Sequence, residues 1–173
     1  MGVSSQKGFT IIELIVVIAI IAVLSGIVMM NVTQYMMKAR NAARKEALRQ
    51  VQKALELYFS ENGSYPITTG DAWWGECTNY GSHPLTGATG YVPGLAPDYI
   101  GQLPLDPKGH NADGTSGCYI YRSVSSNGVA YAYKLMAYHT PEGTFDSTDP
   151  FYDSYYNTSW VVCGGVSVCS SIH

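Results

Sequence analysis

The N-terminal part of the chain is dominated by apolar side chains. Residues 14–30 are apolar except for Ser25 and Gly26, and with residues 9–12 the run is long enough for a membrane-spanning helix. A cleaved secretory signal peptide is the alternative, but the run is longer than the apolar part of such a peptide. It also lacks an Ala-x-Ala cleavage site and carries an acidic residue near its start. We therefore interpret residues 9–32 as an apolar helix that stays with the protein.

The apolar run continues into a segment with helical periodicity. Apolar residues recur at spacings of three and four: Leu48, Val51, Leu55 and Tyr58. This pattern predicts an amphipathic helix over residues 33–60. Because no proline precedes Pro66, we expect one helix from Phe9 to about Phe59, about 75 Å long at 1.5 Å per residue. Gly63 then favours a helix C-cap, and Pro66 cannot continue a helix.

The C-terminal region, residues 61–173, has the pattern of a small sheet. Residues 118–124 and 129–137 read as two strands, and Asn127-Gly128 between them favours a tight hairpin turn. Residues 159–163 are a candidate third strand. The fold class is therefore α+β: a long N-terminal helix, apolar in its first half and amphipathic in its second, packed on a small antiparallel sheet.

Charge separates the helix from the C-terminal region. Only 13% of the residues are charged and 46% are hydrophobic. Residues 9–53 carry six Lys/Arg against two Glu, whereas residues 54–173 carry three Lys/Arg against eleven Asp/Glu. The six are Lys38, Arg40, Arg44, Lys45, Arg49 and Lys53. Nucleic-acid binding depends on clustered Lys/Arg, so the anionic C-terminal region predicts no nucleic-acid contact.

Four cysteines and no C-x-x-C pair favour two disulfides over a zinc site. Three pairings are possible. We favour Cys163 with Cys169, because Gly164-Gly165 permits a tight loop, and Cys77 with Cys118, which would staple the irregular residues 68–117 to the first hairpin strand. Disulfides predict a C-terminal region outside the cytoplasm. The positive-inside rule, applied to the basic residues after the apolar run, predicts the opposite.

The string Lys7-Gly8-Phe9-Thr10-Ile11-Ile12-Glu13-Leu14, followed by an apolar run and a long amphipathic helix, resembles the class III signal of type IV pilins and type II secretion pseudopilins. The resemblance implies that residues 1–8 are a leader, that prepilin peptidase cleaves between Gly8 and Phe9, and that the new Phe9 amine is methylated. It further implies an inner-membrane precursor, an assembly platform in that membrane, and a homo-oligomeric helical filament with the N-terminal helices inside.

The resemblance predicts a structural subunit of a type IV pilus on a prokaryotic cell surface, with a major pseudopilin of a type II secretion system as the alternative. A membrane-anchored binding protein is the third class. No nucleophile elbow, P-loop or dinucleotide fingerprint occurs in the sequence, so we expect no enzyme activity.

Glu13 is a carboxylate inside an apolar helix, where a charge costs about 2.5 to 3.5 kcal/mol on insertion scales. It therefore needs a partner. Cleavage after Gly8 would supply the cationic Phe9 amine, either of the same chain or of a neighbouring subunit. An amine of a neighbour would fix the axial register of assembly, because a shifted subunit leaves both charges unpaired.

The sequence also predicts partners for two charged surfaces, the basic residues of the helix and the acidic residues 140–153. The six basic residues are expected to face lipid headgroups before assembly and acidic regions of neighbouring subunits afterwards, with a solvated helix face as the alternative. The acidic residues 140–153 predict a calcium site at Asp146, Asp149 and Asp153, because calcium takes six to eight oxygen ligands. Simple solvation of these acids is the alternative.

Overall fold

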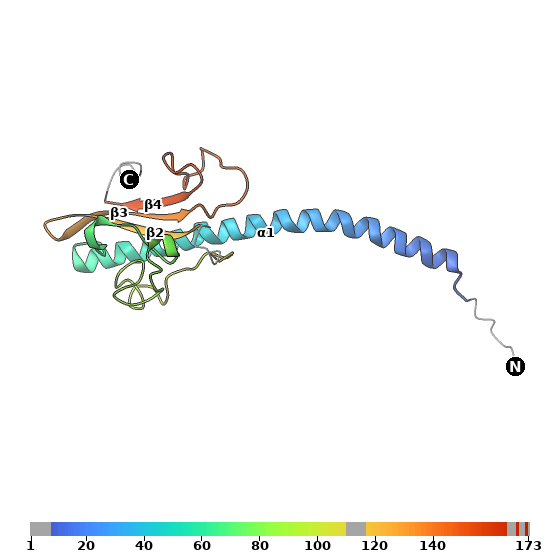
Figure 1. Ribbon diagram of the computed structural model, residues 1–173, viewed down its shortest axis with the longest axis horizontal. Helices are drawn as coiled ribbons and strands as arrows, with labels where there is room; N and C mark the ends of the chain where they lie inside the picture. Colours follow the sequence, from blue (N-terminus) through green and yellow to red (C-terminus); the bar gives the residue numbers. More distant parts are fainter. Residues whose placement is uncertain (1–7, 110–116, 166–168, 170–171, 173) are drawn as a thin grey trace. The chain divides into compact units, whose positions relative to one another are not determined.

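The computed structural model describes residues 8–109, 117–165, 169 and 172. Its helix α1 spans Ile11–Asn62, 52 residues (Figure 1). Two compact units divide the chain, one ending at Lys38 and the other, here called the head, comprising residues 39–173. α1 contributes to both units, so the prediction of a single long helix is confirmed.

The end of α1 follows the predicted chemistry. Gly63 adopts a φ of 65°, which costs little only for glycine, and its N–H donates to the carbonyl oxygen of Phe59 at 2.8 Å. The helix ends at Asn62 rather than near Phe59 as expected. Short 3-10 turns, η1 at Thr69–Asp71 and η2 at Thr78–Tyr80, follow in the irregular connection.

The head contains an antiparallel sheet in the order β1-β2-β3-β4. Its strands are β1 (Trp74–Gly75), β2 (Cys118–Ser126), β3 (Val129–Tyr138) and β4 (Trp160–Gly164). The three predicted strands and the α+β fold class are therefore confirmed. The sequence analysis missed β1, because two residues in a segment rich in Gly and Thr give no period.

The hairpin between β2 and β3 turns where Asn-Gly predicted it. Asn127 has a φ of 51° and Gly128 a φ of 77°. Positive φ at both central positions suits a turn whose twist matches the flanking strands. The turn sets the long β2–β3 register, in which Cys118 lies opposite Tyr138 and Arg122 opposite Lys134.

The head core forms where one face of α1 packs on one face of the sheet (Figure 1). Leu48, Val51 and Leu55 are the fully buried residues of that helix face. Their partners include the buried sheet residues Tyr119, Tyr121, Tyr133, Leu135, Ala137 and Val162. Alternate tyrosines of the strands thus pack in the core of the head.

A smaller apolar cluster forms from the alternate residues of the strands. It contains Cys77, Cys118, Ile120, Met136 and Val161. Because successive side chains of a strand point to opposite faces, this cluster lies on the face away from the main core. Trp73, Tyr80, Tyr138 and Tyr156 pack against it.

The helix core can be tested with two leucines that lie two positions apart. Leu55 is fully buried and Leu57 is 49% exposed. We expect Leu55→Ala to lower the free energy of unfolding by about 2 to 5 kcal/mol, because it leaves a cavity, and Leu57→Ala to lower it by less than about 1 kcal/mol. The measurement is denaturant unfolding of the full chain in detergent, followed by circular dichroism. Equal losses in the two variants would contradict this packing.

Candidate functional site

The N-terminus of α1 is closed by a reciprocal pair of side chains. The backbone N–H of Thr10 donates to Oε2 of Glu13 at 2.8 Å, and the Thr10 hydroxyl donates to the same oxygen at 2.7 Å. In return, the Glu13 N–H donates to Oγ1 of Thr10 at 3.3 Å. This is a capping box, which satisfies orphan donors at a helix start. The sequence analysis assigned Glu13 an assembly role and missed this one, although Thr-x-x-Glu is its sequence signature.

Gly8 and Phe9, the expected cleavage position, precede the first turn of α1. Both residues lie outside regular secondary structure, and Phe9 is 88% exposed. The peptide bond between them is therefore exposed and outside the helix. The remainder of the expected leader, residues 1–7, lies outside the described residues.

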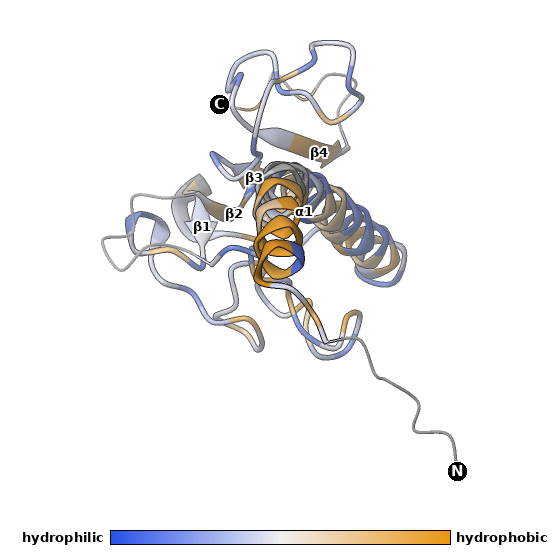
Figure 2. Ribbon diagram, turned by 90° about the vertical axis from the view of Figure 1, so that its right-hand side faces the viewer, coloured by the Kyte–Doolittle hydropathy of each residue, from blue (hydrophilic) through white to orange (hydrophobic). Residues whose placement is uncertain are grey.

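The apolar side chains at the start of α1 have no cover. Figure 2 shows this part of the helix as hydrophobic. More than half of the surface is exposed at Ile11, Ile12, Leu14, Ile15, Val16, Ile18, Ile20, Ile21, Val23 and Leu24. An uncovered apolar surface of this extent marks an interaction site. Within the described ranges, no helix meets both the length and the apolarity required of a membrane span.

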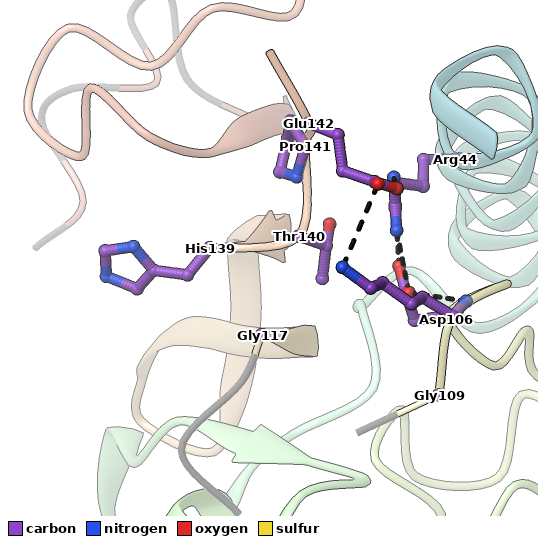
Figure 3. A pocket seen from close by; sticks show the side chains of 9 residues that line it. Arg44, Asp106, Gly109, Gly117, His139, Thr140, Pro141 and Glu142 are labelled. Atoms are coloured by element: carbon purple, nitrogen blue, oxygen red, sulfur yellow. Dashed lines mark hydrogen bonds and ion pairs between the residues drawn. The ribbon is translucent and has the colours of Figure 1, made fainter. Parts of the chain in front are cut away.

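A buried arginine joins α1 to a distant loop of the head (Figure 3). Arg44 is fully buried and donates to Asp106 twice, from Nε at 2.6 Å and from Nη2 at 2.9 Å. Its Nη1 donates to Oε1 of Glu142 at 3.0 Å. Arg44 therefore holds a loop before β2 and a loop after β3 against the same helix.

Glu142 is fixed from several sides. Arg40 donates to both of its carboxylate oxygens at 2.7 Å, and Asn41 exchanges hydrogen bonds with the Glu142 backbone at 2.7 and 3.0 Å. The hydrogen bonds from Arg40, and after them that from Arg44, lower the Glu142 pKa to about 2. We call these five residues the Arg44 cluster: Arg40, Asn41, Arg44, Asp106 and Glu142.

A polar cavity of about 230 Å³ lies beside the Arg44 cluster (Figure 3). Its lining includes Lys108, His139 and Thr140 together with Arg44, Asp106 and Glu142. The charged members of the lining are already paired with one another, and Lys108 Nζ lies 3.9 Å from Glu142. The charged groups that line the cavity are therefore engaged in ion pairs, and we assign the cavity no ligand.

The acidic residues expected to bind calcium have separate partners. Asp149 pairs with Lys45 of α1, and Asp153 pairs with Lys134 of β3 at 2.7 Å, where both side chains are almost fully buried. Asp146 accepts from the N–H and hydroxyl of Thr148 within its own loop. No group of three or more potential ligand residues gathers among the residues described. A calcium site here stays a prediction from the sequence.

Burial and ion pairing act in opposite directions on Asp153. Burial raises its pKa, whereas the hydrogen bond from Lys134 and those from the backbone N–H groups of Tyr156 and Tyr155 lower it. The lowering effects are larger, so the Asp153 pKa lies below its usual value. The carboxylate is thus kept charged by a cation from the sheet.

The basic residues of α1 behave differently from the sequence-based expectation. Arg40, Arg44 and Lys45 form ion pairs inside their own chain, and the guanidinium of Arg49 lies 4.9 Å from the Phe151 ring. The expectation that these side chains face lipid headgroups or neighbouring subunits is therefore wrong for the three ion-paired residues. Lys53 and Lys38 are exposed.

The cysteines form two disulfides in the head. Cys77 is bonded to Cys118 and Cys163 to Cys169, the same pairs that the sequence analysis favoured. The first bond joins residues 41 positions apart and the second residues six positions apart. The longer link ties the irregular connection to the start of β2.

Comparison with known proteins gives a family match at the N-terminus and relatives that cover most of the chain. The model of the prokaryotic N-terminal methylation motif matches residues 3–29. The type II secretion system core protein G of Escherichia coli K12 is 32% identical over 132 residues, which cover 71% of this chain and 83% of that protein. Its counterpart in Pseudomonas aeruginosa is 28% identical over 131 residues, 71% of this chain and 85% of that protein.

A pilus protein matches a shorter region. The type IV wide pilus major component PilA4 of Thermus thermophilus is 39% identical over 61 residues, 35% of this chain and 47% of that protein. These relatives are components of secretion and pilus assemblies. No solved structure matches the chain significantly.

Removal of the buried guanidinium tests the Arg44 cluster. We expect Arg44→Met to lower the free energy of unfolding by about 3 to 5 kcal/mol, because it leaves Asp106 charged and buried. The double variant Arg44→Met with Asp106→Leu should recover part of the loss. Lys53→Met, at an exposed cation of the same helix, is the control and should change stability by about 0.5 kcal/mol or less. An Arg44→Met loss no larger than the control's would refute the assignment.

The Arg44 cluster also predicts an acid dependence. The folded-state pKa of Glu142, about 2, lies below its ordinary value of 4.5. The contribution of the charged Glu142 side chain to folding stability is therefore complete above pH 4.5, and it is lost as the pH falls towards 2. We expect Glu142→Gln to be less stable than wild type at neutral pH and to lose less stability on acidification. The exposed variant Glu46→Gln should follow the wild-type acid profile in denaturant titrations, and an unchanged profile in Glu142→Gln would contradict the prediction.

Proposed function

Since the chain belongs to the family of type IV pilins and type II secretion pseudopilins, we propose that it is a structural filament subunit that acts as the core pseudopilin of a type II secretion system. The 32% identity to the Escherichia coli core protein over 71% of the chain supports this choice most strongly, because the match is too long to be confined to the apolar helix. No catalytic residue is required for such a role.

A type IV pilin is the second candidate. The Thermus thermophilus pilus protein is 39% identical, a higher value than for the core proteins, but over only 61 residues. Two disulfides and a head rich in tyrosine also suit a filament exposed at the cell surface. The two candidates share the assembly chemistry and differ in the process that the filament serves.

The assembly steps follow from the uncovered apolar part of α1. In the precursor, lipid of the inner membrane would cover these side chains, with the head outside the cytoplasm, where disulfides persist. Prepilin peptidase would cut the accessible bond between Gly8 and Phe9, and the Phe9 amine would be methylated. The platform in the membrane would then transfer the helix from lipid to a bundle of identical helices, which buries the same apolar surface.

The two candidates can be separated by deletion of the gene and complementation. A core pseudopilin predicts that extracellular enzymes accumulate in the periplasm of the deletion strain while surface pili persist. A pilin predicts loss of surface filaments that carry this chain, with secretion intact. In either case the intact mass of the assembled subunit should equal that of a chain that begins at Phe9. A filament subunit that retains residues 1–8 would contradict the processing step.

Glu13 has two separable roles, as helix cap and as register charge. We expect Glu13→Ala and Glu13→Gln to insert normally but to reduce filament yield at least tenfold, because both remove the charge that would pair with the Phe9 amine of a neighbour. Glutamine can still accept the capping hydrogen bonds.

Thr10→Ala is the matched control for this series. It removes the two capping hydrogen bonds of the Thr10 hydroxyl and keeps the carboxylate, so its filament yield should stay near that of wild type at equal membrane levels of subunit. Normal assembly of Glu13→Gln together with failure of Thr10→Ala would assign Glu13 to capping alone and reject the register role.

A further inference from the structure

A buried carboxyl group extends the pairing of β1 with β2. Gly75 is the last residue of β1 and lies opposite Ile120. Immediately after it, Glu76 accepts a hydrogen bond from the backbone N–H of Tyr119 through Oε1 at 3.0 Å. Cys77 then forms the disulfide to Cys118. The hydrogen bond to the Glu76 side chain thus lies between the last residue pair of the two strands and the disulfide.

The surroundings of Glu76 do not suit a negative charge. The residue is only 7% exposed, and among the described residues Oε2 has no hydrogen-bond partner. The phenolic oxygen of Tyr119 is likewise buried without a partner there. A buried carboxylate is stable only with a cation or several donors, because its desolvation is otherwise uncompensated.

The charged and titratable groups that face Glu76 also disfavour a negative charge on its carboxyl group. Tyr91 and Tyr119 are phenols that interact with the Glu76 charge, and both are buried. The Asp106 carboxylate lies close enough to oppose ionisation of Glu76. Arg44, the cation paired with Asp106, donates two hydrogen bonds to that carboxylate. Among the residues that the structure describes, no ion pair therefore neutralises Glu76.

We propose that Glu76 is held as a neutral carboxylic acid inside the head and that its ionisation is a pH-sensitive switch, which loosens residues 76–106 from β2 under alkaline conditions. Upon proton loss, Oε2 becomes a buried charge without a donor, beside a second carboxylate. The hydrogen bond from Tyr119 by itself favours the carboxylate, but the cost of the buried charge and the repulsion from Asp106 favour exposure of Glu76 to water, which breaks the Tyr119 contact and disturbs the Asp106 end of the Arg44 cluster. The Cys77–Cys118 disulfide keeps the segment attached, so the loosening is local.

The direction of the pH effect follows from proton linkage. Burial, more than the repulsion from the Asp106 carboxylate, raises the Glu76 pKa from 4.5 to about 8, although hydrogen bonds from the backbone of Tyr119, Glu76 and Asp106 act to lower it. The folded head therefore binds this proton more tightly than the unfolded chain does. The stabilisation is complete below pH 4.5 and is lost as the pH rises through about 8. Within this window the unfolding constant rises up to about tenfold per pH unit.

The test is denaturant unfolding of the full chain in detergent between pH 5 and 9, approximately the linkage window, followed by far-ultraviolet circular dichroism. Wild type should lose stability across the window with a slope of about one proton. Glu76→Gln, an uncharged isostere, should remove that slope. Asp98→Asn, which removes an exposed carboxylate of the same connection, should keep it. The same slope in wild type and Glu76→Gln would overturn the proposal.

A second measurement on the wild type covers the case in which Glu76→Gln does not fold. Infrared difference spectra should show the C=O stretch of a protonated carboxyl group at pH 6 that bleaches as the pH passes about 8. Hydrogen exchange at the Tyr119 amide should accelerate over the same range. Absence of the protonated band at pH 6, or Tyr119 exchange that follows only the hydroxide concentration, would equally overturn the switch.

Discussion

The guanidinium of Arg44 is fully removed from solvent, and two carboxylates from separate loops bind it. The head has a sheet and one helix face to build a core, but its two long connections lack regular structure over most of their length. Asp106 anchors the first connection to α1 and Glu142 anchors the second. A buried guanidinium is tolerated only when its donors are matched, so the positions of both connections depend on the same side chain.

The other constraint on the molecule is the apolar surface at the start of α1. These side chains have no partner within the described chain, whereas the second part of the same helix buries its apolar face on the sheet. Burial of apolar surface contributes roughly 25 cal/mol per Å². The second part of α1 therefore has its apolar face covered by the sheet of the head. The part nearer the N-terminus needs other molecules, lipid or protein, to cover its apolar side chains.

Periodicity in the sequence was sufficient to predict the helix, the β2–β3 hairpin with its Asn-Gly turn, and β4. These elements depend on spacings of two, three or four residues, which are visible locally. The partners of Arg44 were not predictable, because Asp106 and Glu142 lie 62 and 98 positions away and several basic residues could have bound them. Glu76 was missed for a related reason, since nothing near it in sequence shows that Tyr119 supplies its donor. The capping box at Thr10, by contrast, was readable and was overlooked because Glu13 already had a role.

The Arg44 cluster also sets the order in which the head is completed. Contacts between residues far apart in sequence form slowly, because a long loop must close before they are gained. Arg40 and Arg44 leave the ribosome about a hundred residues before Glu142, and Arg44 also pairs with Asp106. Completion of the Arg44 cluster therefore requires the C-terminal third of the chain. Three cations of α1, Arg40, Arg44 and Lys45, therefore lack their full set of ion-pair partners until the loops that carry Asp106, Glu142 and Asp149 have been made.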